Sequence, residues 1–279
     1  MTVTTVTILH PGAMGAAVAA QAIGARRVLW VAVGRSSSTA ERAKVAGLMP
    51  CMSLEEALGA SDVVLSICPP HAAEDVATEV SRSAFEGLYI DANAISPQRM
   101  ERIASEIRPA SVVLDGAIFG PPPGAGRSCR LYVAGDSHAA ELVHTLFKDS
   151  AVEVRSAGGH VGSASALKAS FAGFQKAART LAGVSHALAD AHGVADLLTD
   201  EAKRMPSQIL SDPEYLRSVA ARAWRWGPEM EEVADALRAA GLPTEMAQAA
   251  ASVMARWEHD KDQYDLPLAD ALAHLRQDS

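Results

Sequence analysis

The sequence has few cysteines and aromatic residues and lacks a long apolar run. Its 279 residues include three cysteines, and neither these nor the histidines show the spacing of a metal site or a redox motif, so no metal is predicted. We expect reduced thiols in a cytoplasmic protein. No apolar stretch reaches the roughly 18 residues that suggest a membrane span. The N-terminus also lacks the basic segment that begins a secretory signal.

Basic residues are also scarce. The chain has 25 lysines and arginines against 33 acidic residues, a net charge of −8. This balance argues against broad binding to nucleic acid or to an anionic membrane, which needs a basic face. With 49% hydrophobic and 21% charged residues, the composition is that of a folded globular protein. Its length suits one large domain or two of ordinary size.

The first half alternates short β-rich runs with helical stretches. Such repeated β-α-β units predict a parallel sheet with helices on both faces. Continuously apolar runs such as VVLSI fit strands that are buried on both sides. The predicted strands are 6–9, 28–33, 63–67, 88–91, 112–114 and 130–134, and the predicted helices are 16–24, 39–46, one from about 71, and 97–107.

The second half has no strand pattern. Ala-rich helical segments are predicted at 163–192, 196–210, 213–225, 228–240 and 244–261, punctuated by prolines at 206, 213, 228, 243 and 267. The predicted fold class is therefore an α/β Rossmann-like N-terminal domain over residues 1–157, followed by an all-α C-terminal domain over residues 158–279.

The stretch HPGAMG connects the first predicted strand to a helix. Glycine at position 12 lets the backbone approach a pyrophosphate, and Gly15 permits close packing of the helix on the strand. We therefore predict a dinucleotide site contacted by His10, Pro11, Gly12, Ala13, Met14 and Gly15. His10 replaces the first glycine of the usual G-x-G-x-x-G pattern. Its side chain either points away from the cofactor or contacts a cofactor phosphate or ribose, and both interpretations stay open.

The second predicted strand ends in GRSSST, where NAD sites place an acidic residue for the ribose hydroxyls. Arg35 offers charge-assisted hydrogen bonds to a 2′-phosphate, and Ser36 and Ser37 add neutral donors. We therefore predict NADP(H) rather than NAD(H) as the cofactor. The alternative is a polar loop in which a serine or threonine only caps the next helix.

Five motifs occur in the order and approximate spacing of one superfamily: HPGAMG, GRSSST, SDVVLSICPP, DANAISP and GSASALKASFAGFQKA. The chain resembles the β-hydroxyacid dehydrogenases, which include 6-phosphogluconate dehydrogenase, 3-hydroxyisobutyrate dehydrogenase and the imine reductases. The later stretch RAWRWGPEMEEVADAL is similar to a less characterised 6-phosphogluconate dehydrogenase-like branch with its own C-terminal helical domain. The resemblance spans nearly the whole chain and implies a homodimer formed through the helical domain.

The resemblance implies roles for two segments of the nucleotide-binding domain. Cys68, Pro69 and Pro70 match a segment that passes beside the cofactor riboses. Asn93 and Ser96 match a segment near the nicotinamide and the substrate, where they would offer an amide and a hydroxyl. The alternative for these two residues is a turn followed by a helix cap before Pro97.

The stretch DGAIFGPPPGAG, residues 115–126, is similar to a substrate-binding loop with the pattern G-G-x-x-G-A. Gly120 and Gly124 match this pattern, but Pro121 replaces the second glycine and has no N–H to offer a substrate. Arg127 and Arg130 are either replacement anion ligands or ordinary surface residues.

Lys168 matches the lysine that acts in the dehydrogenases of this superfamily as general acid/base on the oxygen that becomes a carbonyl. The family asparagine four residues later is Ala172 here, so Gln175 is a candidate replacement. Lys176 either supplies a second positive charge or, more simply, is an exposed helix lysine.

The stretch AWRWGPEMEE carries an aromatic and methionine patch made of Trp224, Trp226 and Met230, flanked by acidic residues. At helical spacing, such a patch predicts protein core or a subunit interface, and the alternative is a wall of the substrate pocket.

The sequence therefore predicts an NADP(H)-dependent oxidoreductase that transfers a hydride between the nicotinamide and a small polar alcohol or carbonyl substrate, with a lysine as general acid/base. One alternative is an NADPH-dependent imine reductase, although these enzymes typically replace the family lysine. The other is a non-enzymatic NADP(H)-binding sensor or scaffold, which would explain Pro121 and Ala172.

Overall fold

The computed structural model describes residues 5–22, 25, 27–83, 85–107, 112–205, 212–239 and 241–276. The chain forms two compact units, Met1–Lys168 and Ala169–Ser279. None of the described helices combines the length and apolar character needed to cross a membrane.

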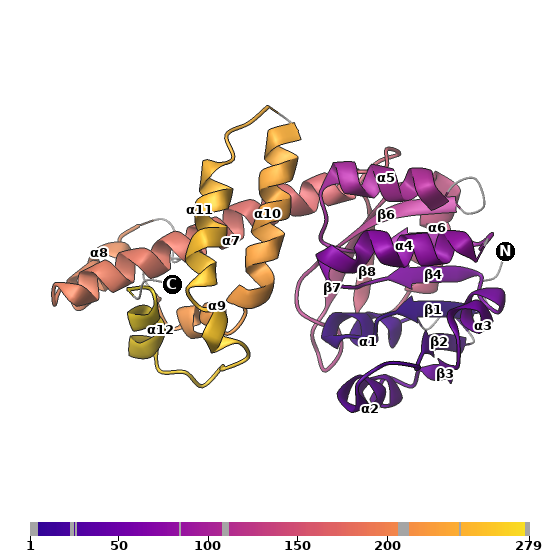
Figure 1. The fold of residues 1–279 in the computed structure, drawn as a ribbon, viewed down its shortest axis with the longest axis horizontal. Helices are drawn as coiled ribbons and strands as arrows, with labels where there is room; N and C mark the ends of the chain where they lie inside the picture. Colours follow the sequence, from indigo (N-terminus) through magenta and orange to yellow (C-terminus); the bar gives the residue numbers. More distant parts are fainter. Residues whose placement is uncertain are drawn as a thin grey trace. The chain divides into compact units, whose positions relative to one another are not determined.

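The first unit is a doubly wound α/β fold (Figure 1). Its described strands form one sheet in the order β3-β2-β1-β4-β5-β6-β7-β8, in which β6 and β7 are antiparallel and all other neighbours are parallel. The strands are β1 (Thr5–Leu9), β2 (Arg27–Val31), β3 (Met49–Cys51), β4 (Val63–Ser66), β5 (Leu88–Asp91), β6 (Val112–Phe119), β7 (Cys129–Gly135) and β8 (Val152–Ser156). The helices are α1 (Ala13–Ala19), α2 (Ser37–Val45), α3 (Leu54–Gly59), the short 3-10 helix η1 (Pro70–Ala72), α4 (Ala73–Arg82), α5 (Pro97–Ile107) and α6 (Ser137–Leu146).

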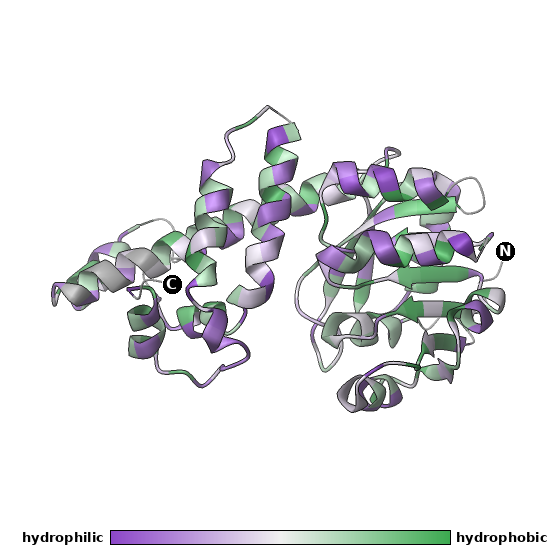
Figure 2. Ribbon diagram, in the orientation of Figure 1, coloured by the Kyte–Doolittle hydropathy of each residue, from purple (hydrophilic) through white to green (hydrophobic). Residues whose placement is uncertain are grey.

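Both faces of the sheet are buried, because successive side chains point to opposite sides of a strand. In β5, Leu88 and Ile90 pack in a core with residues of α1, α2 and α6. Tyr89, between them, packs on the other face with residues of α3, α4 and α5. Figure 2 shows the green, hydrophobic strands at the centre of the sheet, and α4 and α5 in front with polar residues among their apolar ones. This burial explains the continuously apolar strands in the sequence.

The second unit is helical. The long helix α7 (Ser163–Ala191) begins in the first unit and continues in the second. The core of the second unit surrounds Trp257, whose indole N–H donates a 2.7 Å hydrogen bond to the Ala271 carbonyl. The remaining helices are α8 (Ala195–Ala202), α9 (Tyr215–Ala220), α10 (Ala223–Ala239), α11 (Glu245–Ala255), the 3-10 helix η2 (Glu258–Asp260) and α12 (Leu268–His274).

The structure confirms the predicted fold class and corrects several boundaries. The sheet is mixed rather than parallel, because β7 returns antiparallel beside β6. The predicted strand at 112–114 continues to Phe119, so the first part of the predicted loop at 115–126 is strand. Pro228 lies inside α10 rather than at a helix start. The strands β3 and β8 and the helices α3, α6 and α12 were not predicted, and residues 206–210 of a predicted helix lie outside the described residues.

Candidate cofactor and catalytic site

The parallel strands β1, β4 and β5 end at the same edge of the sheet, where Leu9, Ser66 and Asp91 are aligned in register with Asp115 of β6, which continues to Phe119. The predicted site residues His10, Cys68 and Asn93 follow the first three of these strands. The structure therefore brings these parts of the predicted site together within the first unit. Open α/β sheets bind ligands at this carboxyl edge.

The glycine turn after β1 is closely packed. His10 has a φ of +65°, a left-handed conformation that glycine adopts easily and histidine rarely does. The His10 carbonyl accepts a 2.7 Å hydrogen bond from Gly12 N–H. A Cβ atom on Gly15 would lie 2.8 Å from the same carbonyl oxygen, whereas one on Gly12 would meet nothing within 4 Å. Gly15 is thus required by packing, whereas Gly12 borders open space.

The imidazole of His10 is mostly buried. Its Nδ1 atom has no hydrogen-bond partner among the described residues. Burial and the nearby Arg35 guanidinium lower the pKa of His10 to about 4, so the ring is uncharged at neutral pH. An orphaned buried nitrogen at the glycine turn fits a site that holds a polar ligand.

The β2–α2 loop places Arg35 at the surface of the same region, where its charge acts on both His10 and Cys68. Ser36 caps α2, because its Oγ accepts a 3.3 Å hydrogen bond from Thr39 N–H. Ser36 therefore has the capping role that was the alternative for this loop. Arg42 of α2 donates a 3.2 Å hydrogen bond to the Pro11 carbonyl and ties the loop to the glycine turn.

Asn93 connects the ends of β4 and β5. Its amide oxygen accepts a 2.6 Å hydrogen bond from Cys68 N–H, and its amide nitrogen donates to the Ser66 hydroxyl at 3.1 Å. The backbone N–H of Asn93 donates to the Asp91 carboxylate at 3.0 Å. Burial raises the pKa of Asp91 to about 7 and that of the Cys68 thiol to about 12. Cys68 is therefore not an activated nucleophile.

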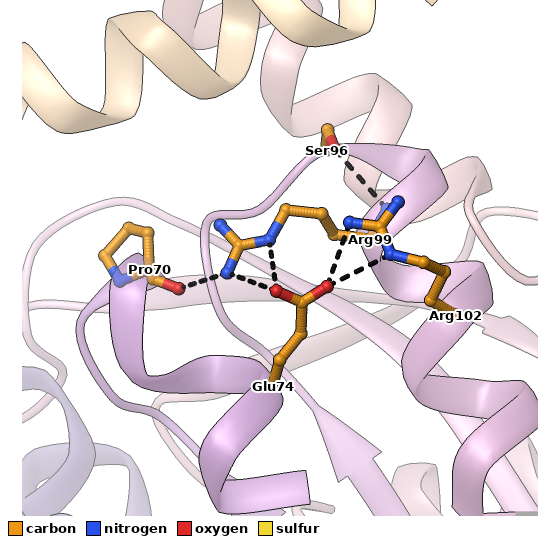
Figure 3. Close-up of polar contacts among 5 residues, drawn as sticks. All are labelled: Pro70, Glu74, Ser96, Arg99 and Arg102. Carbon is orange, nitrogen blue, oxygen red and sulfur yellow. Dashed lines mark hydrogen bonds and ion pairs between the residues drawn. The ribbon is translucent and has the colours of Figure 1, made fainter.

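Ser96 is buried and stabilises the start of α5, where its hydroxyl accepts a 3.4 Å hydrogen bond from Arg99 N–H (Figure 3). The Arg99 side chain donates to the Pro70 carbonyl at 2.9 Å and to Glu74 at 3.2 Å. Arg102 contacts the other oxygen of Glu74 at 2.9 Å. These contacts hold the segment after β4 against α5, which fixes the position of Cys68, Pro69 and Pro70.

Lys168 lies at the extended end of β6. Its ammonium donates a 2.7 Å hydrogen bond to the Ile118 carbonyl and lies 5.0 Å from the centroid of the Phe119 ring. The start of α7 is fixed by the buried carboxylate of Asp115, which accepts hydrogen bonds from Gly162 N–H at 2.9 Å and from Ser165 N–H at 3.0 Å. The predicted catalytic lysine is therefore held at the carboxyl edge of the sheet.

The predicted substrate loop closes as a tight hairpin. Gly124 and Arg127 exchange backbone hydrogen bonds of 2.9 and 3.1 Å, and the two residues between them, Ala125 and Gly126, both have positive φ. The N–H of Gly124 is thus used within the hairpin. Gly120 has a φ of +112° where the chain leaves β6, and Pro121, Arg127 and Arg130 are exposed.

The second unit contains Gln175, Lys176 and the aromatic patch. The Gln175 side-chain oxygen accepts a hydrogen bond from Arg179. The expectation that Lys176 is exposed is wrong: it is buried, paired with Glu229 of α10 and 5.7 Å from the Trp226 ring centroid. Glu229 compensates the charge of the buried ammonium.

Met230 is buried in the core of the second unit, so the core interpretation of the patch is confirmed for this residue, and Trp226 is partly buried against the same core. Trp224 is 41% exposed and contacts the ammonium of Lys261, 4.0 Å from the ring centroid.

Sequence reasoning missed the residues that hold Lys168 in place. Asp115 was considered only as the start of a loop, and Ile118 and Phe119 were assigned no role. The contacts join residues 50 positions apart. One local feature could have suggested a distant carboxylate partner. The first turn of α7 has no acidic residue of its own to accept hydrogen bonds from its backbone N–H groups.

Two family models match separate parts of the chain. Residues 5–95 match the family described as NADP oxidoreductase coenzyme F420-dependent. Residues 189–257 match a domain of unknown function, DUF1932. No curated protein matches the sequence.

Several solved structures share the fold over nearly the whole chain. The protein MTH1747, of unknown function and described as structurally similar to 3-hydroxyacid dehydrogenases, is 25% identical with a TM-score of 0.69, and the match covers 97% of this chain and 99% of that one. The 3-hydroxyisobutyrate dehydrogenase of Mycobacterium tuberculosis, solved with L-serine, is 20% identical with a TM-score of 0.76, covering 98% and 99%. An imine reductase from Pseudomonas sp. is 18% identical with a TM-score of 0.59, covering 98% and 99%. The chain therefore has the 3-hydroxyacid dehydrogenase-like fold, with an N-terminal part similar to NADP oxidoreductases and a C-terminal part similar to DUF1932.

Proposed function

We propose that the protein is an NADP(H)-dependent oxidoreductase acting on a small polar alcohol or carbonyl compound. The observation that carries this proposal is the position of Lys168, whose ammonium lies at the same edge of the sheet as the glycine turn. Reduction of a carbonyl needs a hydride donor and a proton donor, and a cofactor held at the glycine turn and the Lys168 ammonium would supply them.

The residues of the first unit fit NADP(H). Gly12 leaves room beside the turn, His10 has an orphaned nitrogen, and the exposed Arg35 guanidinium acts electrostatically on the His10 ring. These residues would hold the pyrophosphate and the adenosine end of the cofactor. When bound, the cofactor supplies or accepts the hydride.

Lys168 would exchange a proton with the substrate oxygen. In the reducing direction, its ammonium donates the proton to the oxygen that becomes a hydroxyl, while the Ile118 carbonyl holds the nitrogen in place. We assign a positioning role to Asn93 and Ser96, since Asn93 joins β4 to β5 and Ser96 caps α5.

The relatives support this choice of chemistry. The match at residues 5–95 is to a family of NADP oxidoreductases. A reductive aminase from Aspergillus terreus with the same fold, 18% identical at a TM-score of 0.53, was solved with NADPH and a keto ester. The mycobacterial relative was solved with L-serine, a small hydroxyl-bearing acid.

The test is a turnover assay with the purified chain, NADPH or NADP⁺, and pools of small hydroxyacids, ketones and cyclic imines. We expect turnover with alcohols or carbonyl compounds and tighter binding of NADPH than of NADH. Turnover with imines alone would make the protein an imine reductase. Tight NADPH binding with no turnover on any pool would favour a sensor or scaffold, and failure to bind either nucleotide would refute the proposal.

We also propose that the second unit forms a homodimer through α7. Phe171, Phe174 and Leu181 are 49%, 67% and 58% exposed, and their spacing places them on one face of the helix. Because this face is apolar and uncharged, a two-fold axis can bring it against a second copy of itself without opposing like charges. Phe174→Asp is expected to shift the mass measured by light scattering from dimer to monomer, whereas Met52→Asp, at an exposed position of the first unit, is not. A monomeric wild-type chain would refute this proposal.

A further inference from the structure

We propose that His10 is a binding residue for the 2′-phosphate of NADP(H), which its imidazole contacts together with the Arg35 guanidinium. This inference rests on the proposed function. It gives a role to the residue that departs from the usual glycine pattern.

The glycine turn does not need the imidazole ring. The contacts that shape the turn belong to the backbone: Gly12 N–H donates to the His10 carbonyl, and Gly15 packs against that carbonyl. Glycine at position 10 would adopt the φ of +65° with less strain than histidine does. The ring is therefore present at a conformational cost that the fold of the turn does not explain.

The ring also carries a second cost. Its Nδ1 atom is buried and has no hydrogen-bond partner among the residues that the structure describes. A buried polar atom without a partner is destabilising, and a ligand that hydrogen-bonds to it removes this cost. The turn that carries His10 is open at Gly12, because a Cβ atom there would meet nothing within 4 Å.

The charges around His10 favour an anionic ligand. Arg35, on the β2–α2 loop, is exposed and acts electrostatically on the ring. Arg42 of α2 donates to the neighbouring Pro11 carbonyl. Cys68, after β4, is a neutral thiol with a pKa raised to about 12 and contributes no negative charge. These three groups are thus cationic or neutral.

A bound phosphate reverses the electrostatics of the ring. Without ligand, burial and Arg35 keep His10 neutral, with a pKa of about 4. A phosphate dianion offsets the charge of Arg35 and accepts a hydrogen bond from the ring, so the pKa of His10 rises and the imidazole takes a proton from solvent. NADH has no phosphate at this position and should not produce this uptake.

The experiment is isothermal titration of the full chain with NADPH, NADH and 2′-AMP, in buffers of different ionisation enthalpy, at pH values between 6 and 7.5. The variants are His10→Gly and His10→Asn. Both residues accept a positive φ, so the turn keeps its shape while the ring is lost. Thermal melting of each variant checks that the fold is intact.

We expect both variants to bind NADPH and 2′-AMP roughly tenfold more weakly, as loss of a hydrogen bond to a charged group implies, and to bind NADH within about twofold of wild type. We also expect wild type to take up more protons on binding NADPH than either variant does. The second ionisation of the phosphate, with a pKa of about 6, is common to all three proteins, so their difference isolates His10.

Unchanged NADPH affinity in the variants, equal losses for NADPH and NADH, or equal proton uptake would each overturn the role of His10. These outcomes leave the proposed function standing. A wild-type chain that binds no NADPH would instead overturn the proposed function and this inference together.

Discussion

The Ser165 hydroxyl donates a 2.7 Å hydrogen bond to the Asp115 carboxylate, and both side chains are buried. This contact joins the first turn of α7 to β6. Lys168 lies three residues beyond Ser165, so the same contact sets where its ammonium meets the Ile118 carbonyl.

Ser165→Ala is expected to lower both stability and turnover. Loss of a hydrogen bond to a buried carboxylate costs about 1–3 kcal/mol, and a displaced α7 would carry Lys168 away from its position. Thermal melting and steady-state kinetics measure the two effects. Ser170→Ala, at an exposed position of the same helix, is the matched control. Equal behaviour of the two variants would mean that Asp115 does not position Lys168.

Lys168→Met keeps the apolar stem of the side chain and removes the amine. We expect turnover to fall by about 10²–10⁴-fold, the usual contribution of a general acid/base, while NADPH affinity stays near wild type. Lys148→Met, at an exposed position of the first unit, controls for loss of charge. Near-normal turnover of Lys168→Met would remove this lysine from the mechanism.

Gly12→Ala and Gly15→Ala should affect different properties, the first cofactor binding and the second stability. A Cβ at position 15 would lie 2.8 Å from the His10 carbonyl oxygen, so this variant should lose stability, by about 1–3 kcal/mol as for overpacking. A Cβ at position 12 meets no protein atom within 4 Å, so Gly12→Ala should melt like wild type but bind NADPH more weakly. Normal NADPH binding by the stable Gly12→Ala variant would show that the pyrophosphate does not lie beside this turn.

Arg35→Gln should reduce the preference for NADPH over NADH. A charge-assisted hydrogen bond to the 2′-phosphate is worth about 1.5–3 kcal/mol, so NADPH should bind about tenfold more weakly or worse while NADH changes little. Fluorescence titration measures both affinities, with Arg82→Gln of α4, also exposed, as the control. If Arg35→Gln keeps the preference for NADPH over NADH, Arg35 does not bind the 2′-phosphate.

Asp91→Asn tests the buried carboxyl at the end of β5. Burial raises the pKa of Asp91 from 3.8 to about 7, so between these values the folded state holds a proton that the unfolded state has lost. The contribution of Asp91 to stability is therefore fully present below pH 3.8 and is lost as the pH rises through about 7, by at most about 1.4 kcal/mol per pH unit. His10, with a lowered pKa, has the opposite dependence, but it is present in both proteins.

Chemical denaturation at several pH values measures this difference. The stability of Asp91→Asn relative to wild type should increase as the pH rises from about 4 to 7. A constant difference between the two proteins over this range would mean that Asp91 does not titrate as its burial implies.

Local patterns were sufficient to predict much of the first unit. The strand Leu88–Asp91 and the helix Pro97–Ile107 were predicted at their observed bounds. Both predictions rest on the spacing of apolar residues and on helix-capping residues, which are properties of neighbouring positions. The end of β6 was not predictable in this way. Gly116–Phe119 precede a Gly- and Pro-rich stretch and extend the strand by pairing with β7.

The candidate site was predicted by residue type more than by contact. The glycine turn, Arg35 and Lys168 are identifiable from local motifs. The burial of Lys176 depends on Glu229, 53 residues away, and the position of Lys168 depends on Ile118, 50 residues away. Such long-range partners leave no periodic signal in the sequence.

The division of α7 has a consequence for how such proteins can diverge. Lys168 is the last residue of the first compact unit, anchored by β6, and Ala169 begins the second. Mutations accumulated beyond residue 169 can therefore remodel the helical unit without disturbing the lysine, the glycine turn or Arg35. One part of the gene can thus change while the glycine turn and Lys168, encoded by the other part, are inherited unchanged.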